Sequence, residues 1–306
     1  MPHKISILIL TYNRAKDLQA FIENIALQED LDSCVGEILI LNNNSTEDYS
    51  EVERCIETHS KLPIKYIFHK ENLGVSKGRN YLFNIAQYPY LLVLDDDMEF
   101  PAKNAIKNLS LLWEKEQFKN KKIGIITFGV FYYHNKERQK SALPHKKYNK
   151  YKDKEWFYTY YYAGGANIMK KSLIDDIGYY PESFFYGMEE YDYSYKMIRK
   201  GYSLAYDGTV NVLHKESPRG RINNKEKVAM MWYNKSVVAW KYLPRKYYFS
   251  TAFLWSLFYL KETRGDFRGF FNTWKKIKRI PKTINTEKLD EKALSYLKSV
   301  EARLWY

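Results

Sequence analysis

Three consecutive aspartates, Asp95, Asp96 and Asp97, directly follow the apolar run of residues 90–94. Like charges crowded at the end of a buried strand repel one another, so another group must compensate for them. A hard divalent cation does so through oxygen ligands, and with few protein ligands it keeps coordination sites open for phosphate oxygens. The run therefore predicts a metal site that receives a nucleotide diphosphate. An exposed acidic turn is the alternative.

A second acidic cluster consists of Glu189, Glu190 and Asp192, between the aromatic residues 184–186 and a helical pattern over 189–200. Burial beside aromatic rings raises the pKa of a carboxyl group, which suits a general base. Acidic side chains also stabilise the N-terminus of a helix, so a capping role is the alternative.

Three weaker signals accompany these clusters. The Gly164–Gly165 pair permits a close approach of the backbone to a ligand, or forms a simple bulge. His214 ends a short apolar run, and a lone histidine is more often structural than a ligand. Residues 74–80, with Arg79, open a helix whose backbone N–H groups suit an anion.

The elements that must position these residues alternate along the first 100 positions. Short apolar runs typical of buried parallel strands cover residues 4–10, 37–41, 64–68 and 90–94, and helical patterns cover 18–27, 46–59 and 75–86. The alternation predicts βαβ units and a mainly parallel sheet. Ligands bind beyond the carboxyl ends of such strands, where the polar segments 11–14, 42–45 and 95–97 lie.

The second part of the chain is less regular. We expect strands over residues 123–132, 158–171 (with a break at the glycine pair) and 210–213, and a lysine-rich loop over 134–155. Beyond residue 227 the pattern is helical. No stretch approaches the roughly 20 apolar residues of a membrane span, and the apolar run at the N-terminus is too short for a secretion signal. With only Cys34 and Cys55, the chain is no disulfide scaffold, and we expect a cytoplasmic location.

The net charge of +13 belongs to the C-terminal part of the chain. Residues 1–214 hold 28 basic and 28 acidic side chains, whereas residues 215–306 hold 21 basic and 8 acidic ones. This asymmetry predicts an anionic partner for the C-terminal part, such as a membrane surface or an anionic lipid. A nucleic acid is a poor candidate, because the acidic clusters would repel its phosphates.

Six segments, in order, resemble the motifs of the family 2 glycosyltransferases. They are SILILTYNR, ILILNNNST, ENLGVSKGRN, LLVLDDDMEF, YYAGGANIMKK and FFYGMEEYDYSYKMIRKGY, within residues 4–215. The resemblance implies the GT-A fold, a Rossmann-like α/β fold with a mainly parallel sheet flanked by helices. The implied catalytic domain covers residues 1–225, with a nucleotide-binding half (1–100) and an acceptor half (101–225). A basic, aromatic and mostly helical C-terminal extension (226–306) follows it.

The resemblance also implies roles for single residues. The donor nucleotide would contact Thr11, Tyr12, Arg14, Asn42, Asn44, Arg79, Asp95 and Asp96. Asp95, Asp97 and His214 would hold Mn²⁺ or Mg²⁺. Asn42 stands where the family usually has an aspartate, which leaves the choice of base open.

Glu190 falls at the position of the family's catalytic base, with Glu189 and Asp192 as alternatives. Gly164, Gly165 and Ala166 would contact the acceptor. Residues 215–224 would form a flap over the donor, from which Arg219 and Arg221 could reach the phosphates.

We therefore expect an inverting, metal-dependent glycosyltransferase. A UDP-activated hexose or N-acetylhexosamine is the first donor, with dTDP-rhamnose next. The acceptor is a glycan or a lipid-linked oligosaccharide of a bacterial surface polysaccharide. The C-terminal region would contact the inner face of the plasma membrane, and the alternatives are packing on the body or a homodimer contact. An inactive sugar-binding scaffold and a nucleotidyltransferase are the alternative functions. The latter normally has a glycine-rich N-terminal loop, where this chain has TYNR.

Overall fold

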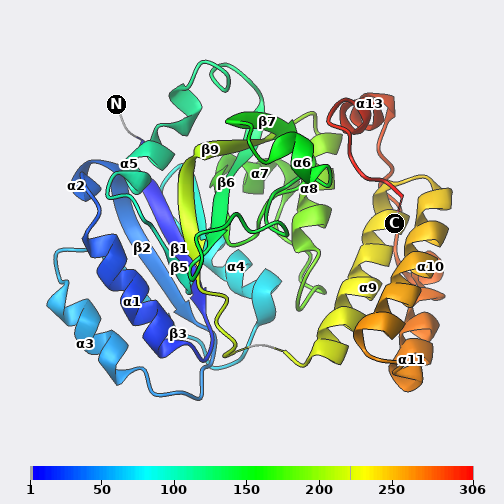
Figure 1. Cartoon of the computed structure of the whole chain (residues 1–306), viewed down its shortest axis with the longest axis horizontal. Coiled ribbons are helices and arrows are strands. Elements are labelled where there is room, and N and C mark those ends of the chain that lie inside the picture. Colours follow the sequence, from blue (N-terminus) through cyan, green and yellow to red (C-terminus); the bar gives the residue numbers. More distant parts are fainter. Residues whose placement is uncertain (1–2, 221, 306) are drawn as a thin grey trace.

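A nine-stranded sheet forms the centre of the computed structural model, which describes residues 3–220 and 222–305 (Figure 1). The strand order is β3-β2-β1-β4-β8-β6-β9-β5, and β7 pairs with β9. The strands are β1 (Ile5–Thr11), β2 (Val35–Asn42), β3 (Ile64–Phe68), β4 (Tyr90–Asp95), β5 (Met98–Glu99), β6 (Ile123–Tyr132), β7 (Trp156–Thr159), β8 (Ala166–Lys170) and β9 (Ser203–His214). Six of these nine described strands run in one direction, and β5, β7 and β8 run against them.

The first strand lies in the middle of the sheet, between β2 and β4. Thr11 pairs with Asn42 and Leu10 pairs with Asp95, so the carboxyl ends of three parallel strands are level. Strands β2 and β4 lie on opposite sides of β1, so the strand order changes direction at β1. This point is the topological switch of the sheet. The polar segments expected to meet do lie at one edge.

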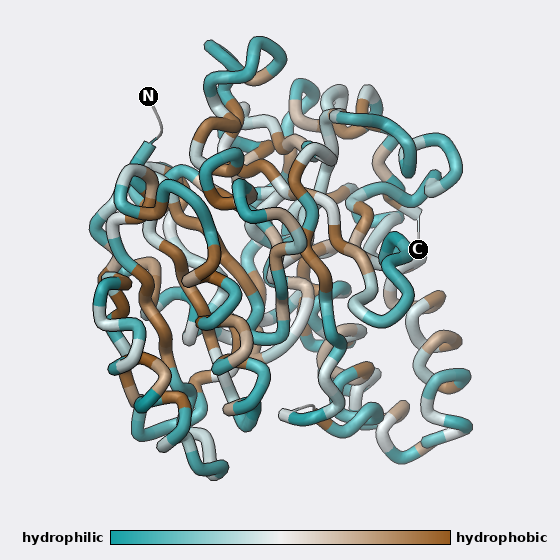
Figure 2. The backbone as a smooth tube through the Cα atoms, turned by 60° about the vertical axis from the view of Figure 1, so that its left-hand side comes forward, coloured by the Kyte–Doolittle hydropathy of each residue, from teal (hydrophilic) through white to brown (hydrophobic). Residues whose placement is uncertain are grey.

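Both faces of the central strands are buried, which explains their unbroken apolar runs. In β1, Ile7 and Ile9 face one core and Leu8 faces the other. Figure 2 shows hydrophobic residues concentrated along these strands. Helices α1 (Ala15–Ala26), α3 (Ser50–Thr58) and α5 (Ala105–Ser110) contribute to the first core, and α4 (Gly74–Ile85), α7 (Ser172–Ile177) and α8 (Glu189–Arg199) to the second. Three short elements, α2 (Leu31–Cys34), η1 (Leu112–Glu114) and α6 (Tyr148–Tyr151), complete this part.

The C-terminal region is helical, as expected. It consists of α9 (Asn224–Tyr242), α10 (Arg245–Glu262), α11 (Phe267–Ile277), α12 (Ile280–Thr283) and α13 (Glu291–Ser299). Trp232 and Val238 of α9 and Leu297 of α13 belong to the same core as Leu8 and Leu39 of the sheet. The region therefore packs on the second face of the sheet. Within the described residues, no helix is both long and apolar enough to cross a bilayer.

Several segments differ from the pattern read from the sequence. The strand expected over 210–213 is the end of the twelve-residue β9, and α5 and α7 were not expected. The strand expected over 158–171 is two strands, β7 and β8, because residues 160–165 leave the sheet and cross the ends of its strands. The loop expected over 134–155 contains α6, whose Tyr151 packs on Phe157 and Tyr206 in a small core of its own. Such local packing leaves no periodic signal in so short a segment.

Candidate active site

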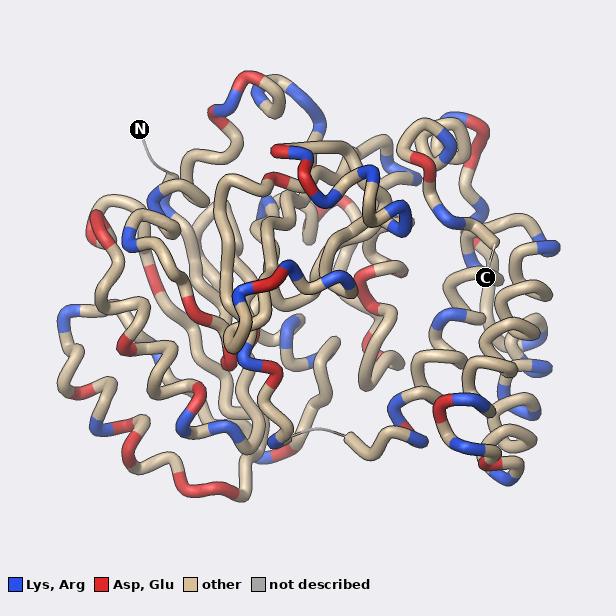
Figure 3. Tube along the Cα trace, viewed as in Figure 1, with Lys and Arg blue, Asp and Glu red and all other residues tan. Residues whose placement is uncertain are grey.

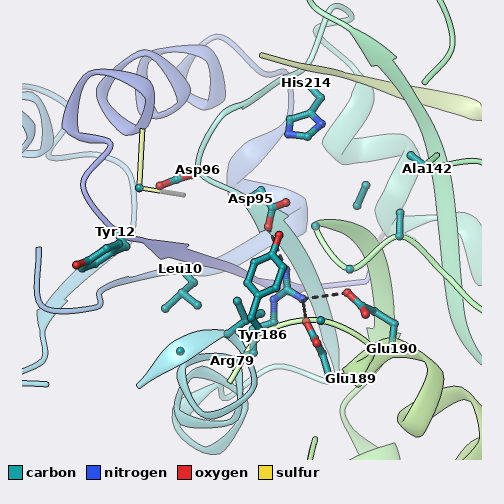
Figure 4. Close-up of a pocket in the computed structure, with 18 of the residues that line it drawn as sticks. Leu10, Tyr12, Arg79, Asp95, Asp96, Ala142, Tyr186, Glu189, Glu190 and His214 are labelled. Carbon is teal, nitrogen blue, oxygen red and sulfur yellow. Dashed lines mark hydrogen bonds and ion pairs between the residues drawn. The ribbon is translucent and has the colours of Figure 1, made fainter. Parts of the chain in front are cut away.

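A cavity of about 520 Å³ opens at the carboxyl ends of β1 and β4 (Figure 4). That volume is within the usual range for ligand pockets. Twelve of the residues selected from the sequence line it: Thr11, Tyr12, Arg14, Arg79, Asp95, Asp96, Gly164, Gly165, Ala166, Glu189, Glu190 and His214. They lie on or directly beside β1, α4, β4, β8, α8 and β9, so segments about 200 residues apart meet in one place.

Arg79 on α4 lies among three carboxylates. Its guanidinium is 3.0 Å from Asp95 Oδ1, 3.7 Å from Glu189 Oε1 and 3.8 Å from Glu190 Oε1. Figure 4 shows Arg79 between Asp95 and the two glutamates. Burial disfavours the charge on Arg79, but Asp95 and the neighbouring groups outweigh it and raise the pKa of Arg79 above its ordinary value. Arg79 thus remains a cation and forms ion pairs with both acidic clusters.

Glu189 and Glu190 begin α8, after Met188 in a left-handed conformation. Burial, helped by Glu190, raises the pKa of Glu189 to about 8, and the buried Glu189 Oε2 has no hydrogen-bond partner among the described residues. Burial also raises the pKa of Glu190, and Arg79 partly offsets this rise. The side chain of Glu190 is 21% exposed and that of Glu189 only 3%. Of the two glutamates, Glu190 is therefore the one whose carboxylate is more accessible from the cavity.

Because Gly164 and Gly165 have no side chains, there is room beside them for the carboxylates of Glu190 and Asp95. A Cβ atom on Gly164 would overlap Glu190 Oε1, and one on Gly165 would overlap Asp95 Oδ2. The peptide between β7 and β8 consequently passes between the two acidic groups. Asn167 Nδ2 donates to the carbonyls of Ala163 and Gly164 and holds this turn in place.

Asp95, Asp97 and His214 form a candidate metal site, since one ligand atom of each lies within 4.8 Å of the others. Gln139 orients the histidine: its Nε2 donates to Glu216 Oε1 at 2.8 Å, so its Oε1 accepts from His214 Nδ1 at 2.9 Å. His214 Nε2 then faces Asp97 Oδ1 at 3.3 Å. Such outer hydrogen bonds are typical of metal-binding histidines.

The buried Asp97 Oδ1 faces no polar partner among the described residues other than His214 Nε2. Burial acts to raise the pKa of Asp97, but His214 and Arg14 outweigh it and hold this pKa below its usual range. Burial lowers the pKa of His214, and Asp97 more than offsets that, so the net shift is upward. His214 Nε2 and Asp97 Oδ1 face each other, and a positive charge between them is favourable. A divalent cation bound by both atoms would supply that charge.

Arg14 neutralises the middle aspartate. Its Nη1 lies 2.9 Å from Asp96 Oδ1 and 3.2 Å from Asp97 Oδ2. Burial, partly offset by Arg14, raises the pKa of Asp96 to about 7. Arg14 Nε donates to the carbonyl of Arg219 at 2.9 Å, which joins the acidic run to the segment after β9.

That segment, residues 215–220 as described, closes against Asp97. The backbone N–H groups of Lys215 and Ser217 donate to the carbonyl and to Oδ2 of Asp97, each at 3.0 Å. Arg219 Nη1 lies 3.0 Å from Glu47 Oε1 and does not line the cavity. Arg221, the other flap arginine selected from the sequence, lies outside the described residues.

Three further selected residues lie away from the cavity. Asn42 uses its amide within the protein, donating to Tyr66 Oη at 2.7 Å and accepting from the N–H of Ser45 at 2.9 Å. Asn44 has φ 65° and does not line the cavity, whereas its neighbour Asn43 does. Asp192 accepts hydrogen bonds from Lys241 Nζ and Tyr242 Oη beneath α8, each at 3.0 Å.

Several lining residues were not selected from the sequence. They are mainly aromatic and apolar side chains together with Gln139: Tyr161, Tyr162, Tyr186, Tyr191, Met188 and Met231. The rings of Tyr161 and Tyr191 stack at 4.9 Å. The aromatic runs at 158–162 and 184–186 were the available signal. Gln139 lies in the expected loop and had none.

Comparison with known proteins gives the same family. The profile of glycosyl transferase family 2 matches residues 6–178. An uncharacterized protein of Haemophilus influenzae is 29% identical over 182 residues, which cover 58% of this chain and 92% of that protein. The processive diacylglycerol beta-glycosyltransferase of Mycoplasma genitalium is 31% identical over 119 residues, which cover 39% of this chain and 34% of that enzyme.

Two solved structures share the fold. A mannosyltransferase from Pyrobaculum calidifontis, in complex with GDP-Man and Mn²⁺, has a TM-score of 0.60 at 16% identity and covers 98% of this chain and 79% of its own. TarS residues 1–349 of S. aureus, in complex with UDP-GlcNAc, has a TM-score of 0.61 at 13% identity and covers 95% of this chain and 83% of its own. The expected GT-A fold is thereby confirmed. The family profile covers more than half of the chain, which therefore belongs to glycosyl transferase family 2 and is a glycosyltransferase.

Proposed function

We propose that the chain transfers a sugar, with inversion at the anomeric carbon, from a nucleotide diphosphate to an acceptor hydroxyl. The observation that carries this proposal is the position of Glu190. Its carboxylate reaches the cavity, has a raised pKa, and lies across the Gly164–Gly165 turn from Asp95. A base and a diphosphate site on either side of one turn are what a direct displacement requires.

Asp95, Asp97 and His214 are the residues that would hold Mn²⁺ or Mg²⁺. The bound ion would supply positive charge to the departing diphosphate. Arg14 and Arg79 keep the surrounding carboxylates paired, so the site can accept further negative charge from the donor. Thr11, Tyr12 and Asn43 line the cavity at the end of β1 and are our candidates for contacts with the nucleoside.

In the proposed step, Glu190 accepts the proton of the acceptor hydroxyl as that oxygen forms a bond to the anomeric carbon. The bond from this carbon to the diphosphate oxygen breaks, and its electron pair leaves with the diphosphate. Attack from the face opposite the leaving group inverts the configuration. Arg79, 3.8 Å from Glu190 Oε1, favours the charged carboxylate before the transfer, while burial favours proton uptake during it.

The acceptor would lie along the aromatic wall formed by Tyr161, Tyr162, Tyr186 and Tyr191. Flat aromatic faces with hydroxyl groups at their edges suit a sugar, whose faces are apolar and whose rim is polar. A glycan or a lipid-linked oligosaccharide of a bacterial surface polysaccharide, met at the cytoplasmic face of the membrane, is our preferred acceptor. We favour a UDP-sugar donor, with dTDP-rhamnose next.

The first experiment is a thermal shift titration with UDP, dTDP, GDP, CMP and ADP, each with Mn²⁺ and with EDTA. One nucleotide should raise the melting temperature with Mn²⁺ alone, since the donor binds through the ion. Asp97→Asn should abolish this metal-dependent shift. A shift that is equal in EDTA would remove the metal from the proposal, and no shift with any nucleotide would favour a scaffold without donor binding.

The second experiment tests Glu190. Glu190→Gln keeps the shape of the side chain but cannot accept the proton, so transfer should fall by about 10²–10⁴-fold while the nucleotide shift persists. Glu182→Gln, an exposed change shortly before α8, is the matched control and should transfer at the wild-type rate. A Glu190→Gln enzyme near the wild-type rate would show that another group is the base.

A further inference from the structure

The outward face of α10 carries large apolar side chains that the fold does not use. Phe249, Phe253, Leu254, Leu257 and Phe258 are 43–64% exposed. The buried face of the same helix has two tyrosines, Tyr248 and Tyr259, and otherwise the small or polar side chains Thr251, Ala252 and Ser256, so the large purely aliphatic and phenylalanine side chains lie on the outside. A helix of a water-soluble protein normally shows the reverse distribution. The exposed face of α10 is therefore built to contact something else.

A second exposed apolar stripe lies on the neighbouring helix α11. Phe267 and Phe271, one turn apart, are 62% and 66% exposed. Helix α11 packs on α9 and α10, and α10 reaches it through the short turn around Gly265. We call the exposed apolar residues of α10 and α11 the aromatic face; they are Phe249, Phe253, Leu254, Leu257, Phe258, Phe267 and Phe271.

Basic side chains border the aromatic face. Residues 245–282 contain ten Lys and Arg but only two acidic residues, and all ten basic side chains are exposed: Arg245, Lys246, Lys261, Arg264, Arg268, Lys275, Lys276, Lys278, Arg279 and Lys282. On α10, Lys246 and Lys261 lie at the two ends of the stripe through Phe249, Phe253 and Leu257, since these residues are three or four positions apart. Figure 3 shows blue segments along the C-terminal helices on its right-hand side.

We propose that this surface docks on an anionic lipid bilayer. Aromatic and leucine side chains enter the boundary between headgroups and acyl chains, and lysines and arginines around them attract anionic headgroups. A second copy of the chain is a poor match, because it would bring two strongly basic borders together. A nucleic acid would match the charges but would leave Leu254 and Leu257 exposed to water.

The position of the aromatic face relates docking to the active site. Helix α9 connects the cavity with the aromatic face: its Lys227 and Met231 line the active-site cavity, and the helix also packs on α10 and α11. Docking would therefore hold the cavity beside the bilayer, where a lipid-linked acceptor is concentrated. This relation rests on the proposed function, whereas the docking itself does not.

Flotation with vesicles tests the docking. The full chain should float with vesicles of equal amounts of phosphatidylglycerol and phosphatidylcholine, and not with phosphatidylcholine alone. Phe253→Ser combined with Leu257→Ser should weaken binding by about tenfold or more, because two apolar anchors are lost. Lys275→Gln combined with Lys276→Gln should weaken it by about fivefold for each charge removed, and added salt should have the same effect.

Matched controls lie on the other side of the molecule. Leu27→Ser with Phe68→Ser removes exposed apolar residues, and Lys61→Gln with Lys65→Gln removes exposed charges. Both controls should bind vesicles like the wild type. Equal losses in the controls would mean unspecific adsorption and overturn the proposal.

Two other outcomes would also overturn the proposal. A dimer in light scattering that Phe253→Ser with Leu257→Ser dissociates, without flotation of the wild type, would assign the face to a second copy. Duplex DNA that competes fully with anionic vesicles and binds as tightly would assign the charges to nucleic acid. The nucleotide thermal shift, measured without vesicles, reports separately on the proposed function, so failure of one does not imply failure of the other.

Discussion

Substitutions of Gly164 and Gly165 distinguish the two parts of the proposed reaction, proton transfer to Glu190 and binding of the donor diphosphate. A methyl group on Gly165 would overlap the carboxylate of Asp95, so Gly165→Ala should weaken Mn²⁺-dependent nucleotide binding. A methyl group on Gly164 would overlap Glu190, so Gly164→Ala should lower the transfer rate and leave nucleotide binding largely intact. Titration calorimetry and a transfer assay on the same preparations distinguish the two. Identical defects in both variants would mean that the turn acts only as a structural unit.

Glu189 gives a prediction about pH and stability. Its folded pKa of about 8 lies above the ordinary value of 4.5, so the folded chain holds a proton that the unfolded chain has released between these values. Stability should therefore fall as pH rises through this window, and the penalty is complete above about pH 8. Glu189→Gln removes the penalty. Its melting temperature should match that of the wild type near pH 4.5 and exceed it increasingly toward pH 9; a difference that does not depend on pH would refute this account.

Asp192 and Gln139 show which parts of the site the sequence could not predict. Glu190 and Asp192 were selected together, but residues two positions apart on a helix point in nearly opposite directions. Helical periodicity alone does not separate Asp192 from the cavity, however, because Asp192 shares a helix face with Glu189, three positions earlier, and Glu189 lines the cavity. Gln139 could not have been found, because its contact with His214 joins segments 75 residues apart in a region without a recognisable pattern.

At the scale of elements, the strands were predicted well because both of their faces are buried. Their apolar runs start and end within two residues of the observed β1 to β4. The break between β7 and β8 was less visible, since residues 160–162 remain apolar and buried after leaving the sheet. Burial without strand pairing looks the same as a strand in the sequence.

The segment after β9 gives a prediction at this scale. Gly220 has φ 65°, and a Cβ atom there would overlap the carbonyl oxygen of Tyr12. Gly220→Ala should keep the segment from closing over the end of β1, which should lower donor affinity and speed proteolytic cleavage within residues 215–224. Glu47→Gln removes the ion pair to Arg219, whose side chain is 54% exposed, and keeps an oxygen that can accept from the N–H of Ala15, so it should have little effect. Limited proteolysis with and without nucleotide and Mn²⁺ compares the two; equal protection would show that closure does not depend on Gly220.

At the scale of the whole molecule, the C-terminal helices share a core with the sheet. The composition of the sequence suggested a separate basic region beginning near residue 226. In the structure, α9 and α13 contribute Trp232, Val238 and Leu297 to the core that also contains Leu8 of β1. We therefore expect the catalytic body and the C-terminal helices to unfold together, although they differ in charge.

Substitution of Asp192 tests whether the catalytic body and the C-terminal helices unfold together. Asp192 is fully buried on α8 and accepts hydrogen bonds from Lys241 Nζ and Tyr242 Oη of α9, each at 3.0 Å. Asp192→Asn leaves Lys241 and Lys196, 3.5 Å from Asp192 Oδ2, without this carboxylate, so the free energy of unfolding should fall by about 3–5 kcal/mol. Glu287→Gln, which removes a partly exposed partner of Lys241 at 3.6 Å and of Arg199 at 2.9 Å, is the control and should cost at most about 1 kcal/mol.

Urea unfolding followed by both circular dichroism and tryptophan fluorescence measures these differences. Five of the seven tryptophans lie after residue 226 and two, Trp113 and Trp156, lie before it, so fluorescence is weighted toward the C-terminal region, whereas the dichroism signal reports on the whole chain. The two signals should change together in the wild type and in Asp192→Asn, at a lower urea concentration in the variant. Two separate transitions in the wild type would mean that the C-terminal helices form an independent unit. In that case Asp192→Asn should shift only the transition of those helices, and the shared core would not couple the two parts.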